Sequence, residues 1–258
     1  MANIHPTAIV HPDAVIAEGV SVGPWSIVEA NVEIGRDSRI ASHCVIKGHT
    51  KLGERNEVYQ FCSIGEDCQD KKYAGELTYL HIGDDNIFRE SCTIHRGTVQ
   101  DNGITKIGNR NLFMVNVHVA HDCVVGDDVI MANNSAAAGH VHIANRAILG
   151  GFTAVHQFCR VGTSAMCGAG TVVLKDIPAY VMTNGNPAEP HGINAEGLRR
   201  LGYDASTISQ LKLAYKIVYR QKLTSVQAQQ RLEEMLQATP EVGPLLDSLR
   251  SASRGIIR

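Results

Sequence analysis

The chain has 258 residues, of which 44% are apolar and 19% are charged, so it can bury a core and does not have the composition of a disordered protein. Its formal net charge of −2 excludes a broad basic face for nucleic acid, and no apolar run approaches the roughly 18 residues that cross a bilayer. The first residues lack the basic and apolar regions of a signal peptide, and the seven cysteines include no metal-type C-x-x-C pair. We therefore expect a cytoplasmic protein with no transmembrane segment and no nucleic-acid partner.

An aliphatic residue recurs at every sixth position from the start of the chain. The series runs unbroken from Ile4 to Ile64 and, after two interruptions and one shift of phase, continues to Val173. Neither an amphipathic helix nor an alternating strand has this period, whereas a hexapeptide repeat does. Each repeat forms one short strand and one corner, so three repeats make a triangular coil with the aliphatic side chains stacked inside. Five cysteines share the fifth place of a repeat, which predicts small buried hydrophobes and not redox groups: Cys44, Cys62, Cys92, Cys123 and Cys159.

Two segments interrupt the repeat and a third ends it. Residues 66–81 and 98–106 lack aliphatic residues at the expected places, which predicts two loops ejected from the coil. The repeat stops at Asp176, a Gly/Pro/Asn-rich link follows, and apolar residues fall at helical spacing from about Asn194. The sequence thus predicts a solenoid over residues 1–190 and a small helical domain over residues 191–258 that covers the open edge of the last coil.

Stacking of coils brings distant residues together on one edge. Residues 18 apart should lie on successive rungs about 4.8 Å apart, which stacks His121 on Gly139 and then on Gln157. By the same arithmetic Asp122 stacks on His140 and Phe158, while His118 and His156 lie near one column. Histidine can act as a general base near neutral pH, and Asp122 could orient it if a corner brings both side chains round. We interpret the isolated histidines, including His95, as structural or merely exposed.

A zinc site is the alternative interpretation of this cluster, because three histidines on one edge can bind zinc. Hexapeptide-repeat carbonic anhydrases bind zinc in this way, with two histidines separated by four residues. Here only two residues separate His118 from His121. The spacing therefore favours a site without metal.

Four stretches of sequence carry a more specific resemblance than the repeat does. They are IHRGTVQ (94–100), NVHVAHDCVVGDD (116–128), AGHVHI (138–143) and GGFTAVHQFCRVG (150–162), supported by QDKKYAGE (69–76), GINAEGLRR (192–200) and SRGIIR (253–258). Over essentially the whole chain the sequence resembles the acyl-carrier-protein:UDP-N-acetylglucosamine O-acyltransferase family, which begins lipid A synthesis. The resemblance implies a left-handed parallel β-helix with a C-terminal α-helical domain, assembled as a homotrimer with active sites in the clefts between solenoids.

The resemblance also implies a reaction and residue roles. A 3-hydroxyacyl group moves from the thioester of acyl carrier protein to the 3-hydroxyl of UDP-N-acetylglucosamine, without a cofactor because the thioester is already activated. His121 would be the general base, Asp122 would orient it, and the Gly139 N–H would stabilise the oxyanion. The resemblance implies substrate contacts from Gln69, Asp70, Lys72, His118, His140, His156, Gln157, Asn194, Glu196 and Arg200. For Asn194, Glu196 and Arg200 the alternative is ordinary polarity at a helix start and on a solvated face.

Two positions depart from the family pattern or tune it. Leu201 stands where family members can have a second arginine, so one phosphate contact is absent or supplied elsewhere. Ala169 matches a position at the end of the acyl channel, where glycine goes with longer chains, and it predicts an intermediate acyl length. Basic residues of the helical region could receive the acidic carrier protein, although ordinary solvated charges explain them equally well: Arg199, Lys212, Lys216 and Arg220.

Three other functions remain as alternatives. The related N-acyltransferase that acts later carries an extra N-terminal domain, whereas repeats begin here at Ile4. An acetyltransferase that uses acetyl-coenzyme A would share the solenoid but not the loop and C-terminal motifs. A non-catalytic scaffold would not need the histidine column. His121 could also serve an acceptor with an amine in place of the sugar 3-hydroxyl.

Overall fold

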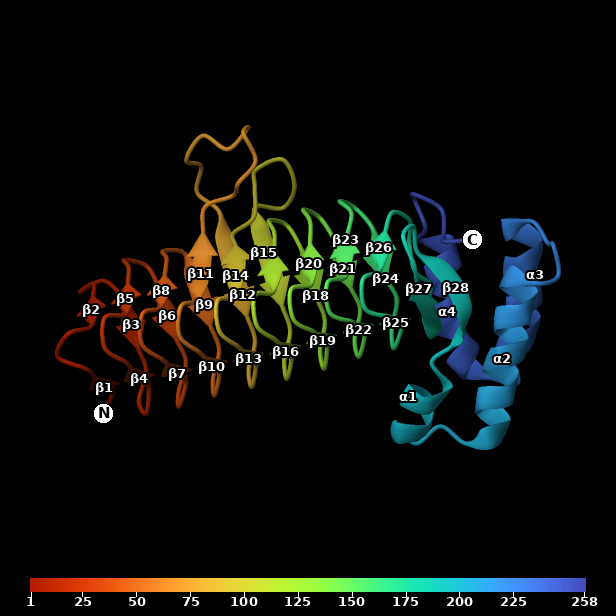
Figure 1. Cartoon of the computed structure of the whole chain (residues 1–258), viewed down its shortest axis with the longest axis horizontal. Helices are drawn as coiled ribbons and strands as arrows, with labels where there is room; N and C mark the ends of the chain where they lie inside the picture. The colour runs from red at the N-terminus through yellow and green to blue at the C-terminus, as the bar shows by residue number, and fades with distance from the viewer.

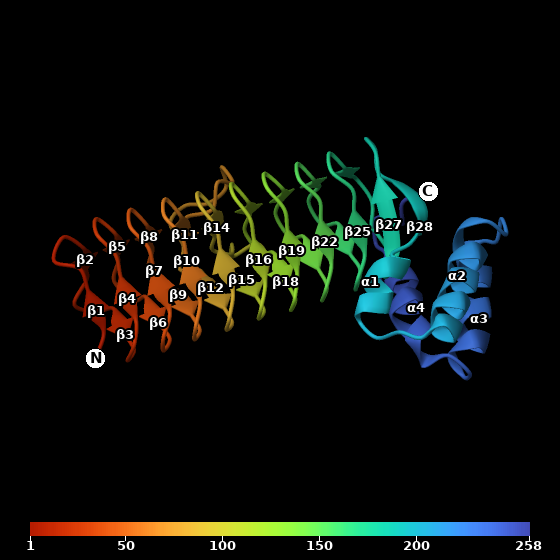
Figure 2. The same cartoon turned by 60° about the horizontal axis from the view of Figure 1, so that its bottom comes forward.

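The computed structural model describes all 258 residues. The chain forms a long left-handed parallel β-helix with a group of helices at one end (Figures 1 and 2). Most strands are two residues long, and they build three sheets that form the sides of a triangular prism. We call the sheets A, B and C in the order in which the chain visits them. The hexapeptide period predicted the triangular coil, and the family resemblance implied its left hand.

Each sheet takes one strand from every coil. Sheet A contains β1 (Asn3–Ile4), β4 (Ser21–Val22), β7 (Arg39–Ile40), β10 (Glu57–Val58), β13 (Ile87–Phe88), β16 (Leu112–Phe113), β19 (Ile130–Met131), β22 (Ile148–Leu149), β25 (Met166–Cys167), β27 (Val181–Asn184) and β28 (Glu189–Ile193). Sheet B contains β2 (Ile9–Val10), β5 (Ile27–Val28), β8 (Val45–Ile46), β11 (Ser63–Glu66), β14 (Thr93–His95), β17 (His118–Val119), β20 (Ala136–Ala137), β23 (Ala154–Val155) and β26 (Val172–Val173). Sheet C contains β3 (Val15–Ile16), β6 (Glu33–Ile34), β9 (Thr50–Leu52), β12 (Tyr79–Ile82), β15 (Ile104–Ile107), β18 (Val124–Val125), β21 (His142–Ile143) and β24 (Arg160–Val161).

The inside of the prism is a column of stacked aliphatic and sulfur-containing side chains. Apart from the first coil, the residues at every sixth position are buried, and Phe88 and Phe113 stack with ring centroids 4.8 Å apart. In the first coil Ile4 is still 41% exposed, because no coil lies above it. The cysteines at the fifth place are buried and free, and burial raises the pKa of Cys44 and Cys123 to about 12, so they are unreactive hydrophobes.

The corners of the coils carry two ladders of polar side chains where the chain passes from sheet C to sheet A. Inside the corner, Asn56, Asn86 and Asn111 lie one above another, and each amide oxygen accepts a backbone N–H from the next coil. Outside the corner, the charge alternates from coil to coil at residues with positive φ. Two of the ion pairs are bidentate: Arg55 with Asp85 (2.8 and 2.9 Å) and Arg110 with Asp128 (2.8 and 3.0 Å). The full external ladder is Asp37, Arg55, Asp85, Arg110, Asp128 and Arg146.

Both ejected loops leave the prism at the corner between sheets B and C. They project side by side from the upper edge in Figure 1, above β11 to β15. The first loop covers residues 67–78 and the second covers residues 96–103. These bounds differ from the expected 66–81 and 98–106, because β12 and β15 extend by two residues each along sheet C and pair with one another from Tyr79↔Ile104 to Ile82↔Ile107.

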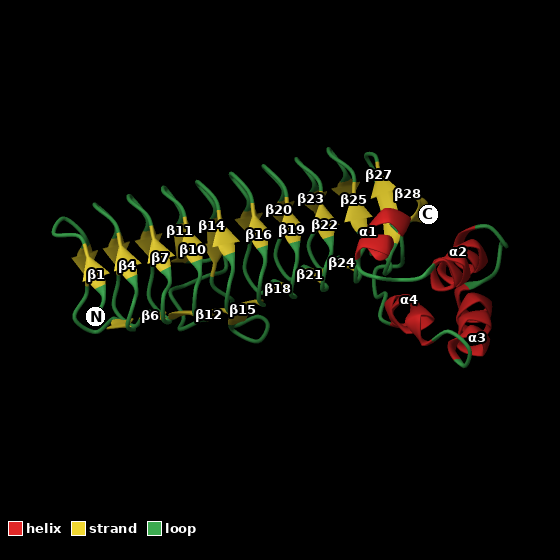
Figure 3. Ribbon diagram, turned by 90° about the horizontal axis from the view of Figure 1, so that it is seen from below, coloured by secondary structure: helices red, strands yellow, loops and turns green.

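The helical domain closes the C-terminal end of the prism (Figure 3). β27 extends sheet A beside β25, and β28 turns back antiparallel to it. The helices are α1 (Ala195–Arg200), α2 (Ala205–Tyr219), α3 (Ser225–Leu236), the 3₁₀ helix η1 (Pro240–Val242) and α4 (Gly243–Arg250). Thr224 caps α3 in a capping box with Gln227. The helices bury their own small apolar core, and none is long and apolar enough to cross a membrane.

Candidate active site

The corner between sheets B and C places the predicted polar residues on consecutive rungs. The first loop leaves here, the second loop leaves one coil later, and the next three coils present His121–Asp122, Gly139–His140 and Gln157–Phe158. Backbone N–H groups link these rungs, from His140 to His121 O (3.0 Å) and from Phe158 to Gly139 O (3.2 Å). The column that the 18-residue arithmetic predicts is therefore present.

His121 and Asp122 form a buried pair within one turn. Asp122 has a φ of 58°, and this left-handed conformation swings its carboxylate back toward the neighbouring imidazole. His121 Nδ1 lies 2.9 Å from Asp122 Oδ2, and the two residues are 7% and 3% exposed. Burial alone would raise the pKa of Asp122, but hydrogen bonds from His121 and Thr98 outweigh it and lower the pKa below its ordinary value. The carboxylate is thus ionised and fixes His121 with Nδ1 protonated, which leaves the lone pair on Nε2.

Gly139 lies against the imidazole ring of His121 and leaves room for it because glycine has no side chain. A Cβ on Gly139 would lie 2.5 Å from both Cε1 and Nε2 of the imidazole, so only glycine fits against this edge of the ring. The Gly139 N–H donates no hydrogen bond within the chain and is free for a ligand. On the other side, His140 stacks on Phe158 with ring centroids 4.4 Å apart, and its Nδ1 lies 3.0 Å from Asp101 of the second loop.

Sequence reasoning missed His95. The residue lies at the end of β14, is 4% exposed, and packs edge-on against His118 with ring centroids 4.9 Å apart. Burial lowers the pKa of His95 to about 4, helped by the charge of His118, so this imidazole is neutral at physiological pH. Burial also lowers the pKa of His118, whose Nδ1 is bonded to the Thr93 hydroxyl at 2.7 Å. The sequence signals for His95 were its place directly before an ejected loop and within the IHRGTVQ stretch (94–100).

These side chains surround a cavity of about 480 Å³ on sheet B beside the corner. Apolar residues in or next to β20 and β23 line its floor: Ala136, Ala138, Ala154 and Val155. The predicted site residues that line it are Gln69, Asp70, His118, His121, Gly139 and Gln157. A pocket that joins a positioned histidine, free polar groups and an apolar floor is a typical small-molecule site.

Other predicted residues do not reach this cavity. Lys72 is exposed on the first loop, and Ala169 is exposed at a corner between sheets A and B. His156 stacks in the column of Ala120 and Ala138, two residues away from the row of His118, and its exposed ring is bonded to Gln157 O. His118 and His156 therefore lie in neighbouring columns, two residues apart along the coil, and not in one column.

The predicted nucleotide contacts lie elsewhere in the single chain. Asn194 caps α1 and donates to Ser164 O at the corner between sheets C and A, whereas His121 lies at the corner between sheets B and C. Glu196 pairs with both Arg199 and Arg200 on the exposed face of α1. In Figure 1 α1 lies below the prism and the loops project above it. One chain alone does not unite these residues with His121.

The cluster of His121, Asp122 and His140 has ligand atoms within 4.8 Å of one another, a spacing that would allow a cation. Both Asp122 oxygens, however, already accept hydrogen bonds from Thr98, and one also accepts from His121. A cation would have to displace these bonds. The hydrogen bonding therefore fits a general base better than a metal site.

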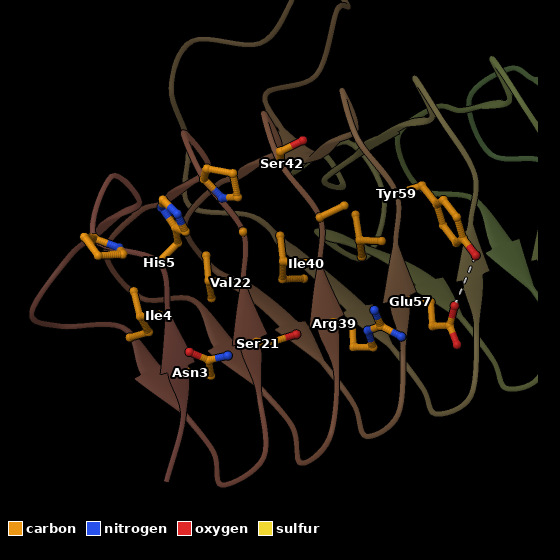
Figure 4. Close-up of a pocket in the computed structure, with 15 residues that line it drawn as sticks. Asn3, Ile4, His5, Ser21, Val22, Arg39, Ile40, Ser42, Glu57 and Tyr59 are labelled. Carbon is orange, nitrogen blue, oxygen red and sulfur yellow. Dashed lines mark hydrogen bonds between the residues drawn. The ribbon is translucent and has the colours of Figure 1, made fainter.

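A larger hollow of about 530 Å³ lies on sheet A near the N-terminus (Figure 4). Its outward row is Asn3, Ser21, Arg39 and Glu57, and Tyr59 bonds to Glu57 at 3.4 Å. His5 lies at its rim but is bonded to Thr7, and no carboxylate holds it as Asp122 holds His121. This hollow offers a polar surface without catalytic groups.

Comparisons with known proteins agree with these features. The family described as UDP N-acetylglucosamine O-acyltransferase, domain 2, matches residues 176–257, and the bacterial transferase hexapeptide family matches residues 13–48. An acyl-[acyl-carrier-protein]–UDP-N-acetylglucosamine O-acyltransferase from Thiobacillus denitrificans is 54% identical over 258 residues, the full length of both chains. The solved structure of LpxA from Acinetobacter baumannii superposes with a TM-score of 0.97 at 52% identity, covering 99% of each chain. A UDP-N-acetylglucosamine O-acyltransferase from Moraxella catarrhalis gives a TM-score of 0.98, also at 52% identity and 99% coverage of both chains.

Proposed function

The chain belongs to the UDP-N-acetylglucosamine O-acyltransferase family, and we propose that it transfers a 3-hydroxyacyl group from acyl carrier protein to the 3-hydroxyl of UDP-N-acetylglucosamine, the first step of lipid A biosynthesis. Full-length identity of 54% to a relative named for this reaction supports the proposal. The observation that carries it in the structure is the His121–Asp122 pair beside a cavity whose floor is apolar. No cofactor enters the reaction, because the thioester is already activated.

The geometry of the pair suggests the order of events. His121 Nε2 accepts the proton of the sugar 3-hydroxyl while that oxygen attacks the thioester carbonyl carbon, and Asp122 stabilises the imidazolium. The carbonyl oxygen becomes an oxyanion, to which the free Gly139 N–H donates. The tetrahedral intermediate then collapses, the C–S bond breaks, and His121 returns the proton to the departing thiolate. The products are the ester and the thiol of the carrier protein.

We place the complete site between two protomers of a homotrimer. If the corner between sheets A and B faces a threefold axis, sheet B of one prism lies against sheet A of the next. That arrangement brings the B/C corner with His121 close to the C/A corner of the neighbour, where Asn194 holds the start of α1 against Ser164. Asn194, Glu196 and Arg200 of the neighbour could then contact the nucleotide of a sugar bound at His121.

The outer surfaces of sheets A and B suit this packing. The outward row of sheet A is apolar through its C-terminal half, with partly exposed side chains that no residue of the same chain covers: Ile87, Leu112, Ile130, Ile148 and Met166. At the A/B corner Trp25, His43 and Phe61 form an aromatic stack with ring centroids 5.2 and 5.3 Å apart. Trp25 and Phe61 are each 60% exposed, and burial against a second copy would remove this apolar surface from water.

The substrate contacts divide between the two protomers. We assign the sugar and acyl chain to the cavity residues Gln69, Asp70, His118 and Gln157. His140, His156 and Lys72 lie outside the cavity, and we assign them to parts of the substrate that extend beyond it. Arg200 would leave its pair with Glu196 to meet a phosphate, and Leu201, 43% exposed at the end of α1, supplies no charge there. Ala169, at the A/B corner, would limit the acyl chain to an intermediate length.

We place the docking site of the carrier protein on the basic side of α2. Lys212, Lys216 and Arg220 line a cavity of about 340 Å³ together with Tyr215 and β28, and none of the three is in an ion pair. An acidic partner would be attracted to this surface. Reversing the charge of Lys212 and Lys216 should raise the Michaelis constant for the carrier protein and leave that for the nucleotide sugar unchanged. An unchanged constant for both would identify these residues as ordinary solvated charges.

A mass-spectrometric transfer assay tests the proposal directly. UDP-N-acetylglucosamine is supplied with 3-hydroxyacyl carrier proteins of graded chain length, and His121→Ala serves as the control. We expect acylated nucleotide sugar from the wild type and a loss of about 10²- to 10⁴-fold in the variant, with the trimer retained. Near-normal turnover by His121→Ala would disprove the assignment of the base. Product only with acetyl-coenzyme A, or only with an amine acceptor, would support another acyltransferase of this fold.

A further inference from the structure

The second ejected loop makes direct hydrogen bonds to Asp122 of the His121–Asp122 pair. Thr98 donates twice to Asp122, from its backbone N–H to Oδ1 (2.8 Å) and from its hydroxyl to Oδ2 (2.6 Å). Directly after the loop, in β15, the Thr105 hydroxyl accepts the backbone N–H of Asp122 at 2.8 Å. Between them, Asp101 accepts from Nδ1 of His140 at 3.0 Å. The segment from Thr98 to Thr105 thus holds Asp122 at both side chain and backbone.

The hydrogen bonds to Asp122 are arranged so that the carboxylate cannot turn freely. Oδ2 accepts from both the Thr98 hydroxyl and His121 Nδ1, while Oδ1 accepts the Thr98 N–H. His140 Nε2 is 3.8 Å from the same Oδ2. A carboxylate fixed through both oxygens presents one defined lone pair to the imidazole, and a hydrogen bond to an ionised group is stronger than a neutral one.

The loop itself is braced, so it can act as a fixed support. Thr98 is 2% exposed, and its carbonyl accepts N–H groups from Asp101 (3.2 Å) and Gly103 (3.0 Å), which closes the loop on itself. A Cβ on Gly97 would lie 2.1 Å from the Ile104 nitrogen, so the two ends of the loop are in direct backbone contact. The Tyr79 N–H also donates to Gly103 O at 2.8 Å, which ties the loop to β12.

We propose that Thr98 is a positioning residue of the acyl transfer, which holds Asp122 in the orientation that directs Nε2 of His121 toward the acceptor hydroxyl. This inference rests on the proposed function of His121 as general base. Thr98 contacts neither substrate nor the reacting atoms; it acts through Asp122. Its effect therefore falls on the chemical step and not on the binding of the nucleotide sugar.

Thr98→Val and Thr98→Ser separate positioning from packing. Valine has the shape of threonine without the hydroxyl, and serine restores the hydroxyl without the methyl group. We expect Thr98→Val to lower kcat by about 10- to 100-fold, the range for losing a hydrogen bond to a charged group, with an unchanged KM for UDP-N-acetylglucosamine. Thr98→Ser should recover most of the activity. Thr153→Val is the matched control, because it removes another fully buried threonine hydroxyl of the coil at a different corner.

A double-mutant cycle with Asp122→Asn gives a second readout that mere destabilisation would not produce. If Thr98 acts through the carboxylate, Thr98→Val should cost little more once Asp122 is an amide, so the two effects on kcat should be far from additive. Additive losses, or an equal loss in Thr153→Val, would overturn the inference. A wild-type enzyme that makes no acylated sugar would instead refute the proposed function. An active wild type with an inactive His121→Ala and a fully active Thr98→Val would refute only the role of Thr98.

Discussion

Replacing Gly139 with alanine tests the catalytic geometry with a single methyl group. The added Cβ would lie 2.5 Å from Cε1 and Nε2 of His121, whereas carbon atoms in contact keep about 3.5 Å or more. The imidazole must therefore retreat by about 1 Å, away from the acceptor and out of line with Asp122. The φ of Gly139 lies outside the left-handed region, so the backbone accepts alanine without strain and keeps the N–H to which we assign the oxyanion.

A displacement of about 1 Å at a reacting group costs on the order of 10²-fold in rate. We expect Gly139→Ala to lose about that much in kcat/KM, measured as formation of acylated UDP-N-acetylglucosamine by mass spectrometry. Thermal unfolding and the elution volume in size-exclusion chromatography, each compared with wild type, check the fold. Gly243→Ala is the control, because its Cβ would meet only Leu236 Cδ1 at an ordinary 3.5 Å. A Gly139→Ala enzyme with normal kcat/KM would refute the placement of His121 against this glycine.

Three further predictions concern the core, the buried carboxylate and the acyl chain. Phe113→Ala should destabilise the protein by about 3–5 kcal/mol in denaturant unfolding, because the ring is fully buried and stacked on Phe88; a loss below 1 kcal/mol would contradict the packing. The pKa of Asp122 is lowered from 3.8, so its ionised form contributes stability above that pH and loses the contribution as pH falls through the lower folded pKa. Thermal unfolding of Asp122→Asn should therefore differ from wild type at neutral pH and converge with it in acid, and a constant difference would be inconsistent with this sign. Ala169→Gly should favour longer acyl donors and Ala169→Met shorter ones, and an unchanged preference would refute its role in chain length.

The sequence predicted the coil because the physical signal is repeated many times. One aliphatic residue in six must point inward for the prism to have a core, and the same rule buried Cys44 and its equivalents. The 18-residue length of a coil also predicted that His121 stacks on Gly139, because no insertion separates these coils. Adding 18 residues does not find the neighbour on the next coil where an insertion separates the two coils. His95 lies beside His118, yet the register Thr93↔His118 is an offset of 25 residues, which no fixed period predicts.

The six-residue period could not predict the contacts that the loops make, or contacts within the proposed trimer. Thr98 reaches Asp122 and Asp101 reaches His140 through a loop whose path depends on its own hydrogen bonds. His156 lies two residues beyond Ala154, which is the residue that matches His118 on sheet B. Its side chain is therefore at the corner of the coil, where it points outward. The residues at the start of α1 lie at another corner of the same chain, so only an assembly of protomers could give them the role that the resemblance implies.

The alternating charges outside the C/A corner bear on how the coils find their correct neighbours during folding. Coils of a solenoid resemble one another, so a chain can form a stack that leaves out one coil and loops it into solvent. Such an error would place Arg110 directly over Arg55, and Asp128 over Asp85, because the sign of the charge changes with each coil. Like charges in direct apposition destabilise a sheet, whereas in the correct order Arg55 pairs with Asp85 and Arg110 pairs with Asp128. The ladder thus destabilises stacks in which a coil is missing. The aliphatic core does not distinguish such stacks from the correct one, because its residues are similar in every coil.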